Sequence, residues 1–208
     1  MTQADHLQYG CGLSAPPDWM NYDASPSLRL QRLPIIGRAR GLGAVRFPAQ
    51  VRYGDIVKGI PVGDASCRAV YCSHVLEHLS LRDFRIALRN THRLLKRGAI
   101  FRLVVPDLRA AAARYLADQS ERAAPHFMTE TFLGVTERSR SLGGLLRGWL
   151  GNSQHLWMWD YASLRHELEL AGFSAARRAQ LGDSEDPLFA SVEDPTRWTD
   201  AVGIQCQA

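Results

Sequence analysis

The sequence predicts an α/β protein built on a mostly parallel β-sheet with helices on both faces. Three observations predict it: short apolar runs alternate with segments of helical periodicity, the helical segments carry capping residues, and no internal repeat interrupts the alternation. A chain of 208 residues has the length of one domain. The expected strands are 6–9, 19–22, 51–53, 69–72, 99–105, 177–181 and 202–206.

The best-marked helix follows the fourth expected strand. Ser80 stands three residues before Asp83, which is the spacing of a capping box, and apolar residues then recur at helical intervals. Gly98 stands just beyond them, where a glycine commonly ends a helix. Two further helices are expected over 108–116 and 160–171, the second followed by Gly172.

Composition places the chain among ordinary globular proteins. Its hydrophobic share of 46% is typical of a protein that needs no disulfide or metal to hold its core. No run reaches the roughly 18 apolar residues of a membrane span, and the residues after Met1 lack the pattern of a secretory leader. The four cysteines are too scattered for a zinc-ligand pair or a disulfide framework, so we expect a cytoplasmic protein with reduced thiols and no membrane insertion.

Basic residues are unevenly distributed. No acid lies between Asp23 and Asp55, whereas that segment holds Arg29, Arg32, Arg38, Arg40, Arg46 and Arg52. Two interpretations stay open, a general bias toward arginine over lysine in this sequence or a positive surface for an anionic partner. Few aromatic residues accompany the arginines, so the pattern is not typical of a nucleic-acid binder.

Small and polar residues follow each of the first five expected strands. The carboxyl ends of parallel strands form the ligand-binding edge of such a sheet. A glycine pair lets backbone N–H groups approach a ligand, and carboxylates after the second and third strands can accept hydrogen bonds from ribose hydroxyls and an adenine amino group. This order suits an adenosyl ligand. The residues are Gly10-Cys11-Gly12, Asp23, Asp55, Ser73-His74 and Pro106-Asp107.

Six stretches at this edge carry a family pattern: LQYGCG (7–12), DWMNYD (18–23), YGDI (53–56), CSHVLEHL (72–79), LLKRG (94–98) and VPDL (105–108). Together they resemble class I S-adenosylmethionine-dependent methyltransferases, and more narrowly the short, type-11-like bacterial members. The similarity continues through 155–161 and 171–173 and so covers nearly the whole chain. It implies a Rossmann-like sheet of seven strands with the last one antiparallel, and S-adenosylmethionine as the cofactor.

The resemblance also implies roles for nine residues of the cofactor edge. They are Gly10 and Gly12 with Cys11 between them at the methionine part, Asp23 at the ribose, Asp55 and Ile56 at the adenine, and Cys72, Ser73 and His74 beside the methyl donor. Methyl transfer is a direct displacement at the sulfonium carbon. Positioning therefore supplies much of the catalysis, and a base is needed only where the acceptor must lose a proton.

The link between the first two strands departs from the usual pattern. Twelve residues separate Gly10 from Asp23, and Pro16-Pro17 would break a helix, so we expect the first crossover helix to be shortened or absent. Residues 1–208 are expected to form a single methyltransferase domain in which 119–158 is a helical, aromatic insert. This insert acts either as a lid over the acceptor or as an appendage packed on the sheet or a second subunit.

Histidine is the expected base because its pKa lies near neutrality. His74 follows a strand at the binding edge and His155 enters with the insert, so these two are the catalytic candidates. Glu77 and His78 are expected to start or cap a helix. His74 and His78 are spaced like a metal-binding pair, but no third ligand stands at a supporting spacing, so the sequence predicts no metal site.

The sequence therefore predicts an S-adenosylmethionine-dependent methyltransferase, and the resemblance implies a hydroxyl acceptor on a small molecule or saccharide. A homodimer stays open. A nicotinamide dehydrogenase is a rival because 10–15 also fits its glycine pattern, although Pro16-Pro17 opposes the helix which that pattern must open. The other rivals are a non-catalytic binding module that uses the arginine-rich segment and a nucleic-acid methyltransferase.

Overall fold

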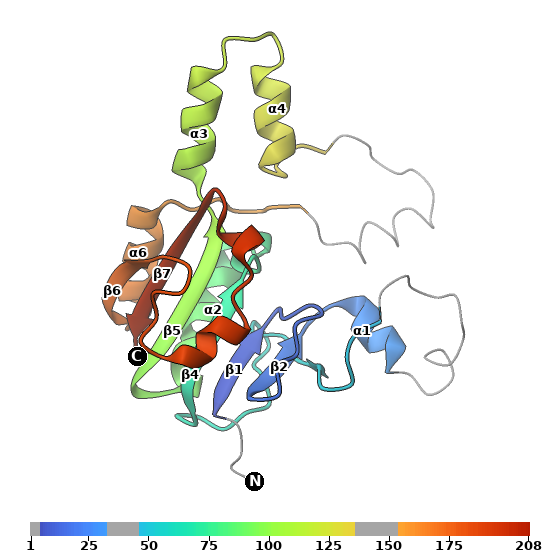
Figure 1. Cartoon of the computed structure of the whole chain (residues 1–208), viewed down its shortest axis with the longest axis vertical. Helices are drawn as coiled ribbons and strands as arrows, with labels where there is room; N and C mark the ends of the chain where they lie inside the picture. Colours follow the sequence, from blue (N-terminus) through green and yellow to red (C-terminus); the bar gives the residue numbers. More distant parts are fainter. Residues whose placement is uncertain (1–4, 33–45, 136–153) are drawn as a thin grey trace.

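A seven-stranded sheet in the order β3-β2-β1-β4-β5-β7-β6 forms the centre of the protein. The computed structural model describes residues 5–32, 46–135 and 154–208. Neighbouring strands from β3 to β5 are parallel, whereas β7 is antiparallel to both β5 and β6, which confirms the predicted sheet (Figure 1). The strands are β1 (His6–Tyr9), β2 (Trp19–Asp23), β3 (Arg52–Tyr53), β4 (Cys67–Ser73), β5 (Leu95–Pro106), β6 (Ser174–Ala179) and β7 (Ala201–Gln207).

Helices α2 (Leu81–Leu94) and α6 (Tyr161–Leu170) cover one face of the sheet and form the main core with it. Both helices begin where the sequence predicts them to begin. The Ser80 hydroxyl accepts a hydrogen bond from the Asp83 N–H at 3.2 Å, and Asp160 caps α6 in a reciprocal pair with Ser163. Each cap satisfies a backbone N–H that the first turn of a helix leaves without a partner.

The end of α2 differs from the prediction. The helix stops at Leu94, and β5 begins at the next residue, so Gly98 does not end the helix. Leu95 pairs with Cys67 of β4 instead, and the Gly98 N–H donates to the Ala208 carbonyl at 2.7 Å. Leu95, which the helical spacing of apolar residues assigned to α2, is therefore part of β5 because it pairs with β4. The predicted strand at 177–181 is similarly displaced, since β6 spans Ser174–Ala179.

No helix joins β1 to β2, which confirms the predicted loss of the first crossover helix. The sheet face on that side is covered instead by the connection between β6 and β7, which contains η3 (Pro187–Ser191) and η4 (Pro195–Trp198). Phe189 packs edge-on against both Trp19 and Tyr71, with ring centroids 5.4 and 6.1 Å apart. In Figure 1 this red segment crosses in front of β1 and β4, whereas α2 lies behind the sheet.

A buried arginine holds this connection on the sheet. Arg102, in the middle of β5, is fully buried and donates hydrogen bonds to Glu193 at 2.5 Å, to Asp183 at 2.8 Å and to the Gln180 carbonyl at 2.6 Å. Its guanidinium also lies 4.9 Å from the centre of the Trp198 ring. Two carboxylates, a carbonyl and an aromatic face thus satisfy a charge that would otherwise be costly to bury.

The arginine-rich segment contains a helix that the sequence analysis did not predict, α1 (Pro26–Gln31). Arg32 next to it donates to the Ala49 and Val51 carbonyls, and Arg29 lies 4.9 Å from the centre of the Tyr53 ring. These two side chains therefore have structural contacts. Arg38 and Arg40 lie outside the described residues.

Helices α3 (Leu108–Ala117) and α4 (Ala123–Glu130) form a hairpin that projects from one end of the sheet (Figure 1). Asp107 caps α3, which lies where the sequence predicts a helix over 108–116, by accepting from the Arg109 N–H at 2.8 Å. The first helix of the predicted insert 119–158 is thus α4. The central residues of the insert, which include Gly143, Gly144 and Trp149, lie outside the described residues.

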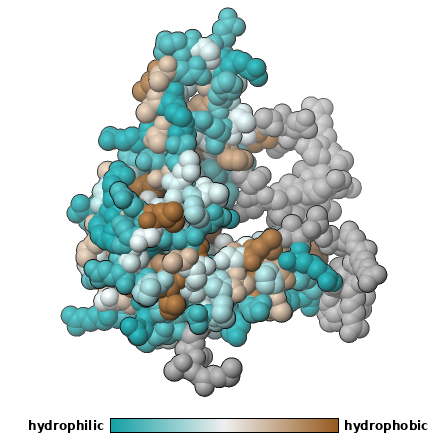
Figure 2. Space-filling model, viewed as in Figure 1, coloured by the Kyte–Doolittle hydropathy of each residue, from teal (hydrophilic) through white to brown (hydrophobic). Residues whose placement is uncertain are grey.

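The face seen in Figure 2 is mostly hydrophilic, with small and separate hydrophobic areas. Among the residues that the structure describes, no helix has both the length and the apolar character needed to cross a membrane.

Candidate active site

The predicted edge of the sheet borders a cavity of about 280 Å³. It lies where β1, β2 and β4 end, and five of the nine residues implied for cofactor binding line it: Gly10, Asp23, Asp55, Ile56 and His74. The parallel pairing of these strands brings their carboxyl ends together.

Asp23 ties two loops of this edge together. Its buried carboxylate accepts a hydrogen bond from the Gly12 N–H at 2.9 Å and another from the Ser25 N–H at 2.7 Å. Each carboxylate oxygen still has a free lone pair after these bonds, because a carboxylate offers about four acceptor positions. Asp23 can therefore hold the loops and also accept hydrogen bonds from a ligand in the cavity.

Gly10 and Gly12 both have the left-handed backbone that glycine favours, with φ of +64° and +56°. They differ in their surroundings. A Cβ added to Gly10 would lie 2.1 Å from Cγ2 of Val75, whereas one added to Gly12 would meet nothing within 4 Å. Gly10 therefore allows the loop after β1 to approach the loop after β4.

Gly10→Ala is expected to destabilise the protein more than Gly12→Ala. Both substitutions incur roughly 1–2 kcal/mol for a left-handed alanine. Only Gly10→Ala also forces a steric overlap, which brings its expected total to about 2–4 kcal/mol. Urea denaturation of the two variants measures the difference, and equal midpoints would contradict the close approach at Gly10.

Asp55 and Ile56 have local contacts as well as a place in the cavity wall. The Asp55 carboxylate accepts from the Val57 N–H at 3.0 Å and lies 3.5 Å from Nζ of Lys58, so it stabilises the turn after β3. Ile56 is buried among apolar side chains of the main core, and its carbonyl accepts from the Asn90 amide at 2.7 Å.

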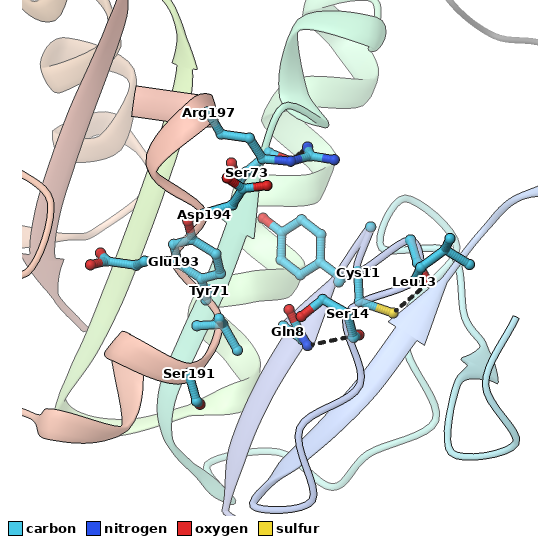
Figure 3. A pocket seen from close by; sticks show the side chains of 14 residues that line it. Gln8, Cys11, Leu13, Ser14, Tyr71, Ser73, Ser191, Glu193, Asp194 and Arg197 are labelled. Atoms are coloured by element: carbon cyan, nitrogen blue, oxygen red, sulfur yellow. Dashed lines mark hydrogen bonds between the residues drawn. The ribbon is translucent and has the colours of Figure 1, made fainter. Parts of the chain in front are cut away.

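A second cavity, of about 500 Å³, adjoins the first at Tyr9 and Gly10. Three more of the implied residues line it: Cys11, Gly12 and Ser73. Its opposite wall comes from the connection between β6 and β7, where Arg197 reaches across and donates to the Ser73 carbonyl at 3.1 Å (Figure 3). Arg197 could not be predicted as a site residue, because nothing in the sequence around it indicates that it lies at the edge of the sheet.

Cys72 is the implied residue that lines neither cavity. Its side chain is buried in the main core beside Tyr9, and burial raises the pKa of its thiol well above the usual range. The alternation of side chains along β4 explains this, since Tyr71 and Ser73 face the second cavity and Cys72 faces the other side of the sheet.

The two catalytic candidates lie beside the same buried carboxylate. Nδ1 of His74 is 3.4 Å and Nε2 of His155 is 3.9 Å from Oε1 of Glu77. Burial lowers the pKa of both imidazoles, that of His155 to about 4, where the neighbouring His78 adds to the effect. Glu77 belongs to η2 (Leu76–His78), so it does start a short helix, but its side chain is buried and burial raises its pKa to about 8.

Comparison with known proteins agrees with this geometry. A family model described as a methyltransferase domain matches residues 6–177. Solved structures with the same fold include S-adenosylmethionine-dependent methyltransferases from Methanosarcina mazei (TM-score 0.52, 16% identity, 99% of this chain and 93% of that chain) and Thermotoga maritima (0.51, 14%, 100% and 83%). A structure of PigF with SAH is also similar (0.50, 17%, 98% and 50%). No protein of curated function matches significantly in sequence.

The seven-stranded sheet and the glycine and acidic residues at its edge define a class I S-adenosylmethionine-dependent methyltransferase fold. The chain belongs to the methyltransferase-domain family, whose model covers most of its length. Both results confirm the resemblance to class I S-adenosylmethionine-dependent methyltransferases, and the narrower likeness to type-11-like bacterial members stays a prediction.

Proposed function

We propose that this methyltransferase binds S-adenosylmethionine across the two cavities and transfers its methyl group to a hydroxyl of a small molecule or saccharide. One observation carries the cofactor part. Of the nine residues implied for cofactor binding, five line the 280 Å³ cavity and three line the adjoining one, so eight surround one continuous edge. The acceptor class rests on the family resemblance alone.

The charges of this edge support one orientation of the cofactor. The buried Asp23 and the neighbouring Asp55 would accept hydrogen bonds from the ribose and the adenine. The methionine part would then lie near Gly10 and Gly12, where the guanidinium of Arg197 across the second cavity is suited to its carboxylate. His74 borders the first cavity at the end of β4, near the expected methyl group.

His74 and His155 remain the proposed bases. Their lowered pKa values keep both imidazoles neutral near pH 7, and a neutral imidazole has a lone pair that can accept a proton. The described part of the insert 119–158 is the proposed lid, in which exposed Phe132 and Trp157 would contribute an apolar wall for the acceptor. A cytoplasmic location and a homodimer belong to the same proposal and rest on the sequence.

Calorimetric titration with S-adenosylhomocysteine tests the proposal, with NADH as the comparison ligand. We expect one equivalent of S-adenosylhomocysteine to bind and NADH to give no heat. Saturable NADH binding without S-adenosylhomocysteine binding would instead identify a dehydrogenase. No heat from either ligand would favour the non-catalytic module.

A further inference from the structure

Glu77 is buried without a hydrogen-bond partner. The residue is 0% exposed and lies in η2, four positions after the end of β4. Neither of its carboxylate oxygens has a hydrogen-bond partner among the described residues. The guanidinium of Arg197 exerts a favourable electrostatic influence on Glu77, but that side chain donates to the Ser73 carbonyl and forms no ion pair with Glu77. A carboxylate in this position is costly unless a cation or a proton compensates it.

Three imidazoles surround this carboxylate. The ring nitrogens nearest Oε1 of Glu77 are Nδ1 of His74 at 3.4 Å, Nε2 of His155 at 3.9 Å and Nε2 of His78 at 4.0 Å. The rings of His78 and His155 meet edge to face, with centroids 5.0 Å apart. Residues from two distant parts of the chain thus gather around one group.

Backbone carbonyls determine which nitrogen of two of these rings carries the proton. Nε2 of His74 contacts the Arg197 carbonyl at 2.8 Å, and Nδ1 of His78 contacts the Gln154 carbonyl at 3.0 Å. A carbonyl only accepts, so the proton of each neutral ring lies on that nitrogen, and the nitrogen that faces Glu77 presents a lone pair. The lone pairs of His74 and His78 therefore both face the carboxyl group of Glu77.

We propose that Glu77, His78 and His155 form a binding site for a divalent transition-metal ion, zinc being the best match. One ligand atom from each residue lies within 4.8 Å of the other two. Two imidazoles and one carboxylate with a position left open are the protein ligands of many catalytic zinc sites, and a carbonyl on the far nitrogen of a ligand histidine is the usual support. Small side-chain movements would bring these atoms to the separation of roughly 3.3 Å that tetrahedral zinc requires.

The sequence alone predicts no metal site because the third ligand is remote. His155 follows His78 by 77 residues, and Glu77 reads as part of a helix start. The backbone closes that distance, since the N–H groups of Leu156 and Trp157 both donate to the Glu77 carbonyl, at 2.8 and 3.1 Å. The last residues of the insert are thereby fixed beside the loop that follows β4.

The ion would lie at the wall of the proposed cofactor cavity, because His78 also lines that cavity. An acceptor hydroxyl on the open position would ionise near neutral pH. Its oxygen would then bond to the methyl carbon as the carbon–sulfur bond breaks; the electron pair returns to the sulfonium sulfur, and the hydroxyl proton passes to solvent. Because the ion takes the lone pair of His155, only His74 remains available as a base when the ion is bound. This step rests on the proposed methyl transfer, whereas the ion site does not.

Zinc titration of protein stripped with EDTA tests the site, with calorimetry and thermal unfolding as the readouts. We expect one equivalent to bind to the unmodified protein and to raise its Tm by roughly 5–10 °C at saturating zinc. Glu77→Gln and His155→Ala should each weaken binding by at least about 100-fold and abolish the rise in Tm. His166→Ala removes an exposed histidine outside the cluster and should bind as the unmodified protein does.

Cobalt provides a second readout, since it should give the intense visible absorption of a tetrahedral ion in the unmodified protein and in His166→Ala only. The proposal is overturned if the unmodified protein takes up no zinc, or if both cluster variants retain its affinity. His155→Ala decides the matter if Glu77→Gln does not fold. Titration of the same metal-free protein with S-adenosylhomocysteine tests the methyl-donor site separately from the zinc site. Failure to bind S-adenosylhomocysteine would reject the methyl-donor site and would leave the zinc result unchanged.

Discussion

Arg102→Met is expected to lower the free energy of unfolding by about 3–5 kcal/mol, the usual cost of removing one partner from a buried ion pair. Methionine fills part of the space but leaves Glu193, whose side chain is 1% exposed, without its cation. Asp183 and the Gln180 carbonyl lose hydrogen bonds as well. For a chain of this length the expected fall in Tm is about 10 °C.

Arg165→Met is the matched control for this experiment. Arg165 forms a hydrogen-bonded ion pair of the same kind with Glu169, but on the exposed surface of α6, where such pairs contribute little. Thermal unfolding followed by circular dichroism should separate the two variants clearly. Similar Tm values for both would mean that Arg102 does not hold the β6–β7 connection on the sheet.

Asp23→Ala is expected to weaken S-adenosylhomocysteine binding by at least about 100-fold. Hydrogen bonds to a charged group contribute about 1.5–3 kcal/mol each, and two ribose hydroxyls would lose theirs. The Gly12 and Ser25 N–H groups also lose their acceptor, so the loops that line both cavities are no longer tied together.

Asp18→Ala is the control for this loss, because Asp18 is an exposed aspartate in the same loop between β1 and β2. We expect it to bind S-adenosylhomocysteine with unchanged affinity in the same calorimetric titration. Unchanged affinity in Asp23→Ala would reject the proposed orientation of the cofactor.

Local patterns were enough to predict the sheet and much of its edge. The alternation of strands and helices, the cap at Ser80 and the twelve-residue gap after Gly10 each depend on neighbouring residues, and the structure confirms what they indicated. The prediction that Gly98 ends the helix is wrong, because a glycine after an apolar helix face can also lie near the start of a strand. Only the pairing with β4 distinguishes a helix end from a strand start.

The remote parts of the site could not be predicted in this way. Arg102 stands in an apolar strand, which signals a buried partner, but Glu193 lies 91 residues further on. Glu77 is a similar case, since the sequence places it at a helix start while part of its surroundings comes from the last residues of the insert. The number of residues between two positions in the sequence does not indicate whether their side chains are in contact in the fold.

The replacement of the first crossover helix by the β6–β7 connection also affects how the chain is made. Arg197 and Ser73 lie 124 residues apart, so the wall of the second cavity forms by a highly non-local contact. During synthesis, the face of the sheet that packs against Phe189 would stay uncovered until residues 187–198 had left the ribosome. Completion of the ligand-binding edge is thus expected to be a late event in folding, and a nascent chain that ends before residue 180 would expose that face to chaperones.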